Sequence, residues 1–428
     1  MRTLKTKPAQ GLHGELTVPG DKSISHRGIM LGAISEGTTT LTHFLTSADC
    51  LSTLAAFQQL GVPIERDGTT VTVHGVGLHG LKPSSEPLDM GNSGTTTRLI
   101  MGLLAGQSFK TTLVGDDSLS TRPMRRVSEP LATMGAKMTT TDGHLPVTVT
   151  GQKLHAVHYQ LKVASAQVKS ALILAALQAD DPTTLIEKLP TRDHTERMLT
   201  AFGGDIQTAA DGVTITVAPQ PHLTGQSMTV PGDMSSAAFF MTAASLVPGS
   251  KITLKDVGLN KTRTGLLEIL KTMGGNVSIK SEPTTGEPLG DLTIQSADLK
   301  PINIGKDQIP AVIDELPLVA LLAAKANGIS RITGAEELRV KETDRISAIV
   351  TEFKKLGIAI EELPDGFVID GRQPWHVVDP VLDAHDDHRI GMVLGIAALL
   401  VETPLQLKGA DSVRISYPEF FDDLDQLL

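Results

Sequence analysis

A unit of about seventy residues recurs along this chain, and this recurrence limits the possible folds more than any other feature of the sequence. In five copies, an apolar residue followed by glycine ends a helical pattern. These glycines are Gly61, Gly135, Gly203, Gly274 and Gly357, at intervals of 74, 68, 71 and 83 residues. Solenoid repeats are shorter, so each copy has the size of a domain fragment.

The copies share one order of predicted elements. A helix rich in small apolar residues comes first, as over 99–105, and an alternating strand such as 38–42 follows it. An amphipathic helix is next. In the fifth copy, apolar residues recur at spacings of three and four over 345–356, and Gly357 supplies the left-handed residue that ends this helix. Two further strands complete a βαβαββ-like unit.

Six such copies span nearly the whole chain, and the sixth ends early, after a helix over 417–428. Copies that cannot bury their helices alone must pack around one another, and three copies per domain is the economical grouping. The alternative is a single large α/β fold in which the apolar-glycine helix ends are coincidental. Because helix order, strand order and glycine position recur together, we favour the repeat interpretation.

Composition narrows the possible locations of the protein. The chain has 428 residues and 40% hydrophobic content, enough for two or more domains. The longest apolar run, 391–401, is too short to span a bilayer, and we find no targeting segment at the amino end. Cys50 is the sole cysteine, which excludes an internal disulfide and a thiolate cluster. We therefore expect a cytoplasmic protein that does not enter membranes.

The charge balance argues against nucleic-acid binding. The formal net charge is −10, whereas affinity for a phosphate backbone comes mostly from a basic surface. Any binding of small anions would therefore need positive charge that is concentrated locally.

Helix starts in the first half of the chain carry such local charge. In the first copy, Lys22, Ser23 and Arg27 follow a Gly-Asp start, so free N–H groups, a hydroxyl and two cations suit a phosphate. A capped helix with solvated cations is the plainer interpretation. The second copy repeats the pattern over 90–98, where Gly94 allows close approach of a ligand, and it lacks a Walker A ending.

Three further segments extend these candidates. The segment 117–126 brings three arginines to a helix start, of which Arg125 and Arg126 fit a solvated face. In the third copy, small polar groups over 164–170 suit hydroxyl recognition. In the segment 191–197, we interpret His194 as a helix-capping or surface residue rather than a base.

The second half of the chain carries acids among its cations. Asp314 and Glu315 precede a strongly apolar helix; we assign a function to Asp314 and a helix-dipole role to Glu315. The segment 339–346 is either a surface ion-pair ladder or part of a site, and 386–389 opens the next copy with a similar cluster. No HExxH pattern is present, so we expect no metal and no cofactor.

Four ordered segments, 21–27, 91–98, 339–346 and 386–389, resemble the signature segments of the 5-enolpyruvylshikimate-3-phosphate synthase family of enolpyruvyl transferases. The resemblance covers the whole chain. It implies a two-domain inside-out α/β barrel, with three βαβαββ repeats in each domain and the active site in the interdomain cleft. The implied amino-terminal domain is 21–231, and residues 1–20 with 232–428 form the carboxyl-terminal domain.

The resemblance also implies the reaction and its participants. The enolpyruvyl group of phosphoenolpyruvate would pass to the 5-hydroxyl of shikimate 3-phosphate, and phosphate would leave, in a monomeric enzyme. The residues implied for shikimate 3-phosphate are Lys22, Ser23, Arg27, Ser165, Ala166, Gln167, Arg192, Asp314 and Lys341. Those implied for phosphoenolpyruvate are Lys22, Gly94, Arg122, Gln167, Arg345, His388, Arg389 and Arg414. Asp314 is the implied base, and Glu342, with Lys22, is the implied acid.

The chain departs from the commonest family pattern at three places: over 92–99, at Ala166 where a second serine is usual, and at Arg414 where a lysine is usual. Lys408 is the other candidate for that lysine. These departures bear on the response to glyphosate, which inhibits the family at the phosphoenolpyruvate site.

Two alternatives remain at this stage. One is the related transferase that acts on UDP-N-acetylglucosamine and uses a loop cysteine, although the sequence around Cys50 indicates a structural residue that opens a helix. The other is a non-catalytic sensor of phosphorylated metabolites, which would not need Asp314 and Glu342.

Overall fold

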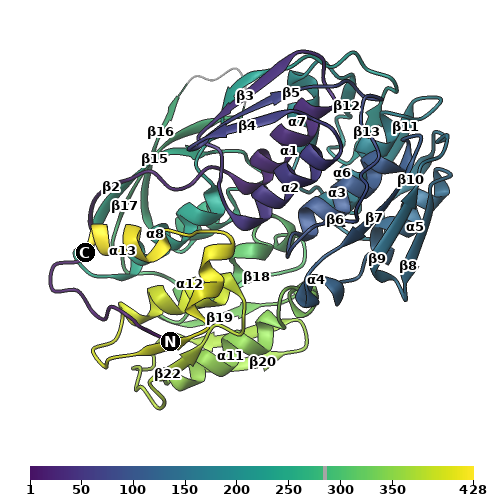
Figure 1. Cartoon of the computed structure of the whole chain (residues 1–428). Coiled ribbons are helices and arrows are strands. Elements are labelled where there is room, and N and C mark those ends of the chain that lie inside the picture. Colours follow the sequence, from purple (N-terminus) through teal and green to yellow (C-terminus); the bar gives the residue numbers. More distant parts are fainter. Residues whose placement is uncertain (283–286) are drawn as a thin grey trace. The chain divides into compact units, whose positions relative to one another are not determined.

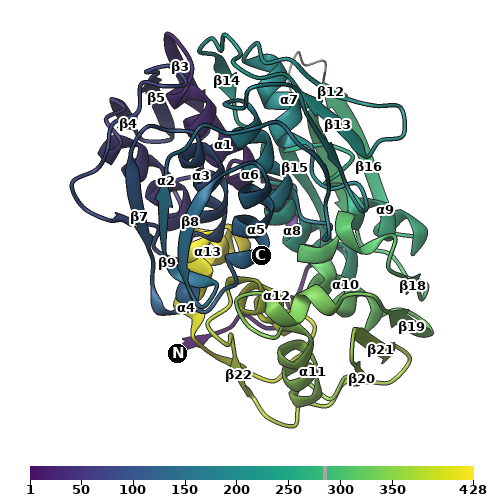
Figure 2. The same ribbon diagram turned by 90° about the vertical axis from the view of Figure 1, so that its right-hand side faces the viewer.

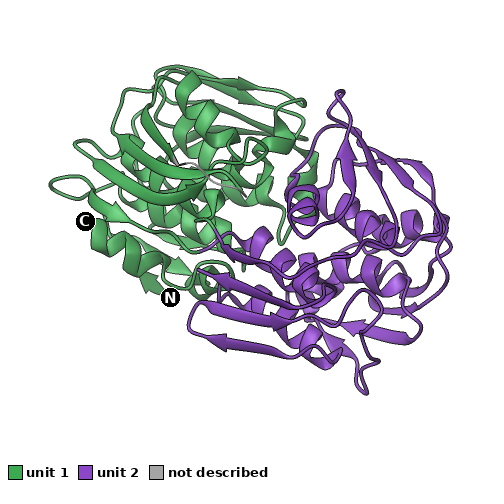
Figure 3. Cartoon of the chain, turned by 90° about the horizontal axis from the view of Figure 1, so that it is seen from above, with its two compact units in different colours: residues 1–19, 231–428 green, residues 20–230 purple. Residues whose placement is uncertain are grey.

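The computed structural model describes residues 1–282 and 287–428, which form two compact units. Unit 1 comprises residues 1–19 and 231–428, and unit 2 comprises residues 20–230 (Figure 3). Each unit has its own apolar core. Within the described part of the chain, no helix is long and apolar enough to cross a membrane.

Unit 2 contains the first three copies of the repeat, and their elements follow the predicted order. The first copy consists of α1 (Lys22–Ala33), β3 (Thr38–Thr42), α2 (Ala48–Gln59), β4 (Ile64–Asp67) and β5 (Thr70–His74). The second consists of β6 (Leu88–Asp89), α3 (Gly94–Ala105), β7 (Lys110–Val114), α4 (Asp117–Ser120), α5 (Arg125–Thr133), β8 (Lys137–Thr141) and β9 (His144–Thr150). The third consists of β10 (His158–Gln160), α6 (Ala166–Ala176), β11 (Thr183–Ile186), α7 (His194–Ala201), β12 (Ile206–Thr208) and β13 (Thr214–Val217), and β14 (Ser227–Thr229) follows.

Unit 1 contains the other three copies and two strands from the amino end, β1 (Arg2–Thr3) and β2 (His13–Leu16). The fourth copy consists of α8 (Met234–Leu246), β15 (Lys251–Gly258), α9 (Gly265–Thr272), β16 (Asn276–Glu282) and β17 (Leu289–Gln295). The fifth consists of β18 (Asn303–Ile304), the 3-10 turns η1 (Ile309–Ala311) and η2 (Ile313–Glu315), α10 (Leu316–Ala323), β19 (Ile329–Ile332), η3 (Glu336–Val340), α11 (Arg345–Lys355), β20 (Ala359–Leu363) and β21 (Gly366–Asp370). The sixth consists of β22 (Val381–Asp383), α12 (His388–Ala398), β23 (Gln406–Lys408), η4 (Ala410–Ile415) and α13 (Phe420–Leu427).

The four-stranded sheets all follow one strand order. In β6-β7-β9-β8, for example, the first pair is parallel and the other two pairs are antiparallel. The repeated pairing confirms that the apolar-glycine signal marks copies of one unit. The glycines themselves are left-handed as predicted, with φ between 77° and 95° at Gly61, Gly135, Gly203, Gly274 and Gly357.

Strands from outside a copy complete three of the sheets. β2 precedes α1 in the chain but pairs in parallel with β15 of unit 1, whereas β14 precedes α8 but pairs in parallel with β3 of unit 2. β1 pairs antiparallel with β23 and supplies the third strand of the sixth sheet, β1-β23-β22. The early end of the sixth copy is thus compensated by residues from the opposite end of the chain.

The first helices of the copies lie inside each unit, and the sheets lie outside them (Figures 1 and 2). All residues of α8 are buried, whereas strands such as β9 bury alternate side chains. Gly102 of α3 permits a close approach of α3 and α6, because a Cβ there would lie 1.9 Å from the carbonyl oxygen of Ala171 in α6. This packing brings together the starts of α1, α3 and α6, which carry the predicted anion ligands of unit 2.

Candidate active site

Three helices of unit 2 begin with side-chain caps. Asp21, Ser93 and Ser165 accept hydrogen bonds from Ile24, Thr96 and Val168 at 2.9, 3.2 and 3.4 Å, so they start α1, α3 and α6. A capped helix start still presents further N–H groups and the positive end of its dipole. Each start is therefore suited to binding a negative group, as the sequence predicted.

Arg27 is buried on α1 and donates to three uncharged oxygen atoms. Its Nε lies 2.6 Å from Thr195 Oγ1, its Nη2 lies 2.8 Å from Ser170 Oγ, and its Nη1 lies 3.0 Å from the Ser23 carbonyl oxygen. Hydroxyl and carbonyl acceptors orient the guanidinium without neutralising it. Ser170 and Thr195 lie in the segments 164–170 and 191–197 but were not among the predicted site residues, because the sequence does not show which hydroxyl receives a guanidinium.

Lys22 opens α1 and forms an ion pair with the buried Asp49 at the start of α2. The next residue, Cys50, is fully buried in α2, and its Sγ lies 3.9 Å from the Lys22 carbonyl oxygen. Burial raises the pKa of the Cys50 thiol to about 12. The thiol is therefore protonated at neutral pH and lies on a packed helix, not on a loop.

A buried chain of hydrogen bonds joins three helices beneath these groups. His26 Nδ1 lies 2.7 Å from Thr53 Oγ1, Thr53 Oγ1 lies 2.7 Å from Thr96 Oγ1, and Thr96 Oγ1 lies 2.6 Å from Ser93 Oγ. Burial, followed by the charge of Lys22, lowers the pKa of His26 to about 3. His26 is therefore neutral, and its role is to connect α1 with α2 and α3.

The start of α3 lies beside two guanidinium groups. A Cβ at Gly94 would lie 3.2 Å from Arg98 Nη1 and 3.4 Å from Arg122 Nη1, so both guanidinium groups lie against the backbone of this helix start. Gln167 joins α3 to α6, because it accepts from Arg98 Nη1 at 2.6 Å and donates to Thr95 Oγ1 at 3.0 Å. Arg98 stood in a recognised segment but was not among the predicted ligands.

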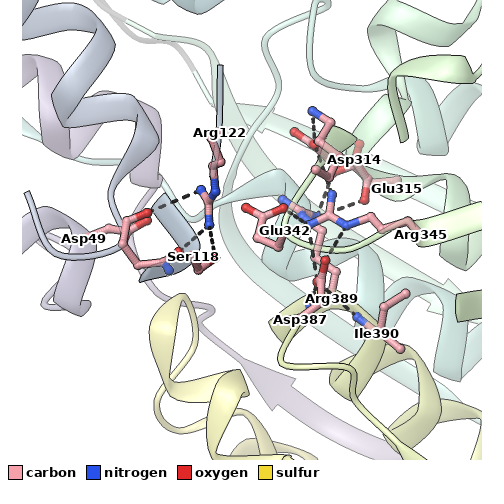
Figure 4. A network of polar contacts seen from close by, with 12 residues as sticks. Asp49, Ser118, Arg122, Asp314, Glu315, Glu342, Arg345, Asp387, Arg389 and Ile390 are labelled. Carbon is pink, nitrogen blue, oxygen red and sulfur yellow. Dashed lines mark hydrogen bonds and ion pairs between the residues drawn. The ribbon is translucent and has the colours of Figure 1, made fainter. Parts of the chain in front are cut away.

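Arg122 follows α4 and is held by polar groups of the second copy. Its Nη2 donates to Asn92 Oδ1 at 2.6 Å and to Ser118 Oγ at 3.3 Å, and Figure 4 shows the contact with Ser118.

Two other predicted site residues, Ala166 and Arg192, belong to the third copy. Ala166 lies at the start of α6 and Arg192 lies in the segment before α7, and both are half-buried. His194 is the buried first residue of α7, so of the two predicted alternatives the surface position is wrong and the position at a helix start agrees.

In unit 1, the acid pair lies in η2, directly before α10. Asp314 Oδ1 lies 3.5 Å from Lys341 Nζ and 3.7 Å from Arg345 Nη1 (Figure 4). Glu315 is buried, accepts from the Ser235 hydroxyl and lies 3.5 Å from Arg389 Nη1. Glu315 is the N-cap residue of α10, so its charge lies where the helix dipole favours it, and its carboxylate also binds specific partners.

Arg345 is fully buried at the start of α11 and is surrounded by carboxylates. Its Nε lies 2.8 Å from Asp387 Oδ2, and its Nη2 lies 2.7 Å from Glu342 Oε2. Burial alone would lower the pKa of this guanidinium, but the charges of Asp387, Glu342 and Asp314 outweigh burial and raise it. Arg345 therefore fixes the positions of three acids while it remains charged.

Asp387 also caps α12, because its Oδ1 accepts from the backbone N–H of Arg389 at 2.8 Å. His388 is the buried first residue of that helix. The guanidinium of Arg389 donates to the Asp314 carbonyl oxygen at 3.1 Å. One aspartate thus ties Arg345 and Arg389 to a common point, which joins the two clusters predicted separately at 339–346 and 386–389.

Part of the segment 339–346 forms a surface ion-pair ladder, which was one of the two interpretations of its sequence. Arg339 lies 2.7 Å from Asp344 and 2.9 Å from Glu362, at the outer side of α11. Arg414 and Lys408 are both exposed, on η4 and β23, and no contact joins either to the acid cluster within the described ranges. These ranges also contain no group of three or more acidic, histidine or cysteine side chains able to hold a metal ion.

The fold is shared with enolpyruvyl transferases. An enolpyruvyl transferase of known structure, NikO from Streptomyces tendae, matches with a TM-score of 0.79 at 19% identity, over 99% of this chain and 97% of that chain. At this identity the likeness concerns the fold alone.

Closer comparisons identify the family. The model of EPSP synthase (3-phosphoshikimate 1-carboxyvinyltransferase) matches residues 6–424, so the chain belongs to the EPSP synthase family. A 3-phosphoshikimate 1-carboxyvinyltransferase of Lactiplantibacillus plantarum is 63% identical over 100% of this chain and 99% of its own length. The EPSP synthase of Acinetobacter baumannii matches with a TM-score of 0.87 and 44% identity, over 99% of this chain and 97% of that chain.

Proposed function

We propose that this protein transfers the enolpyruvyl group of phosphoenolpyruvate to the 5-hydroxyl of shikimate 3-phosphate and releases inorganic phosphate. The observation that carries the proposal is the position of Asp314, in a chain of this family. Its carboxylate lies 3.5 Å from Lys341 Nζ, and its carbonyl oxygen accepts from Arg389. A proton acceptor among cations is what addition of a hydroxyl to an anionic substrate requires.

Shikimate 3-phosphate would be bound mainly through hydroxyls and cations at helix starts. The proposed residues of unit 2 are Lys22, Ser23, Arg27, Ser165, Ala166, Gln167 and Arg192, and those of unit 1 are Asp314 and Lys341. Arg27 supports this assignment best, because hydroxyls of two other helices, α6 and α7, orient its planar fork of donors. We propose that 21–231 acts as one functional domain and that 1–20 with 232–428 acts as the other.

Phosphoenolpyruvate would be bound by arginines of both domains. The proposed residues are Lys22, Gly94, Arg122, Gln167, Arg345, His388, Arg389 and Arg414. Each substrate carries a carboxylate and a phosphate, so together they bring roughly five to six negative charges. Arginine suits such ligands, because its planar fork of N–H donors matches carboxylate and phosphate oxygens.

In the proposed reaction, the methylene carbon of phosphoenolpyruvate gains a proton and the 5-hydroxyl attacks the adjacent carbon, which gives a tetrahedral intermediate with a methyl group. That methyl group then loses a proton as the C–O bond to phosphate breaks, so the enol double bond re-forms and phosphate leaves. Asp314 would accept the hydroxyl proton. Glu342, with Lys22, would supply the proton to carbon. Bound phosphate groups favour the protonated form of a neighbouring carboxyl, so Glu342 would act as an acid only with both substrates present.

The testing experiment measures inorganic phosphate released from phosphoenolpyruvate, with and without shikimate 3-phosphate. We expect release only when both are present. Release with UDP-N-acetylglucosamine instead would indicate the related cell-wall activity, which the buried Cys50 thiol argues against. Binding of both substrates without release would indicate a sensor. We further propose a monomer that acts in the cytoplasm, which sedimentation and cell fractionation would test.

A further inference from the structure

A buried triad of charged residues lies in the third copy of unit 2, outside the proposed site. Lys169 of α6 has a side chain only 1% exposed, and its Nζ lies 2.7 Å from Glu196 Oε1 and 3.1 Å from Glu187 Oε2. The same Nζ donates to the Thr191 carbonyl oxygen at 3.4 Å. Two carboxylates and a carbonyl thus share one ammonium group away from solvent.

The triad joins three segments of the chain. Lys169 belongs to α6, Glu187 directly follows β11, and Glu196 belongs to α7. Glu187 Oε1 also accepts from the backbone N–H of Thr191 at 3.1 Å and from the Thr191 hydroxyl, which closes the turn between β11 and α7. The start of α7 is therefore fixed against α6 by charge as well as by packing.

The neighbours of the triad in sequence hold the guanidinium of Arg27. Ser170 follows Lys169, and Thr195 precedes Glu196. Their hydroxyl oxygens lie 2.7 Å apart, and they accept from Arg27 Nη2 and Nε at 2.8 and 2.6 Å. A shift of α7 relative to α6 would separate these two acceptors, and Arg27 would lose one of them.

Stability does not explain why the triad is charged. Burying ions is costly, and apolar residues of similar volume often stabilise a fold equally well. Burial raises the pKa of Glu196 even though Lys169 opposes the shift, which indicates incomplete compensation. Directional contacts of Lys169 to three segments do what an apolar cluster cannot, because they fix the register of α7 as well as its distance.

We propose that Lys169, with Glu187 and Glu196, positions Arg27 through Ser170 and Thr195 and thereby sets the affinity for shikimate 3-phosphate. This inference rests on the proposed function. Lys169 is a positioning residue, because its contacts are with Glu187, Glu196 and Thr191 and it is sealed from solvent.

Two variants test the proposal, each compared with a matched control. Thr195→Val keeps the shape and removes the acceptor of Arg27 Nε; Lys169→Met removes the ammonium group. The control is Thr183→Val, because Thr183 is buried in β11 of the same unit and its hydroxyl has no hydrogen-bond partner in the described part of the chain. Steady-state kinetics and calorimetry with shikimate 3-phosphate alone provide the measurements.

We expect Thr195→Val and Lys169→Met each to raise KM and Kd for shikimate 3-phosphate by about tenfold, the usual effect of losing one hydrogen bond to a charged group. KM for phosphoenolpyruvate and kcat should change by less than about twofold, and Thr183→Val should match the wild type. The double variant should bind only slightly more weakly than either single variant, because both changes act on one guanidinium.

Unchanged Kd for shikimate 3-phosphate in Thr195→Val would overturn the proposal, whether or not Lys169→Met folds. An equal rise in KM for both substrates would overturn it too, because it would indicate general loosening of unit 2. If the wild type bound no shikimate 3-phosphate, the proposed function itself would fail. Calorimetry of the wild type alone shows this outcome, so it is distinguished from a failure of the inference about Lys169.

Discussion

Arg27 in unit 2 and Arg345 in unit 1 are both buried arginines near a helix start, yet they are held in opposite ways. Arg27 donates to two hydroxyls and a carbonyl oxygen. Arg345 donates to the carboxylates of Asp387 and Glu342 and lies 3.7 Å from Asp314. Hydroxyls and a carbonyl oxygen orient the guanidinium of Arg27, whereas the guanidinium of Arg345 holds three carboxylates in place. A buried arginine can therefore be positioned by neutral groups or can itself position acids.

The largest effect is expected from the acids that Arg345 organises. Asp314→Asn keeps the shape but cannot accept a proton, so turnover should fall by about 10²–10⁴-fold while both substrates still bind. Phosphate release and calorimetry measure the two quantities. Asp298→Asn, on an exposed residue of the same unit, is the control. Near-normal turnover in Asp314→Asn would remove this residue from the mechanism.

The two buried arginines should also contribute differently to the free energy of unfolding. Arg345→Met leaves buried carboxylates without their cation and should lower the free energy of unfolding by about 3–5 kcal/mol. Arg27→Met removes hydrogen bonds to two hydroxyls and a carbonyl oxygen and should lower it by about 1–3 kcal/mol. Denaturant unfolding measures both values. Equal losses would show that the two arginines are not held in different ways.

A smaller effect is expected at Lys22, which belongs to unit 2 but is paired with a carboxylate, Asp49. Lys22→Met should weaken phosphoenolpyruvate binding by roughly tenfold, the factor that corresponds to one charged contact, and turnover should fall with it. Calorimetry of this variant against Lys110→Met, which changes an exposed lysine of β7, separates a local contact from a general effect of charge. Unchanged affinity would contradict the assignment.

The smallest effect is expected at Cys50. Because burial holds the pKa of its thiol at about 12, Cys50 should resist alkylation in the native protein at pH 8. Cys50→Ser should retain turnover while losing about 1 kcal/mol of stability, since a hydroxyl is buried in place of the thiol. The folded-state pKa is raised above the unfolded value, so this residue favours folding less as pH rises from 9 to 12. Loss of turnover in Cys50→Ser would restore the alternative with a catalytic cysteine.

Sequence patterns were sufficient for the repeated unit, because glycine at a helix end and apolar periodicity are local signals. They also identified the segments that carry Arg27, Asp314 and Arg345. They did not predict Ser170 and Thr195 as partners of Arg27, or Asp387 as a partner of Arg345. These partners lie far from the arginines in sequence, and a lone hydroxyl or capping aspartate has the same local pattern whether or not it receives a guanidinium.

The pairing of β1 with β23 has a consequence for how the protein is made. Unit 2 is one continuous stretch and can close once β14 has left the ribosome, whereas in unit 1 β2 stays unpaired until synthesis reaches β15 and β1 stays unpaired until it reaches β23. During synthesis from the amino end, the first strands therefore remain without their partner strands until those are translated. Removal of residues 1–3, which takes away β1, should therefore slow the folding of unit 1 and leave the folding of unit 2 unaffected.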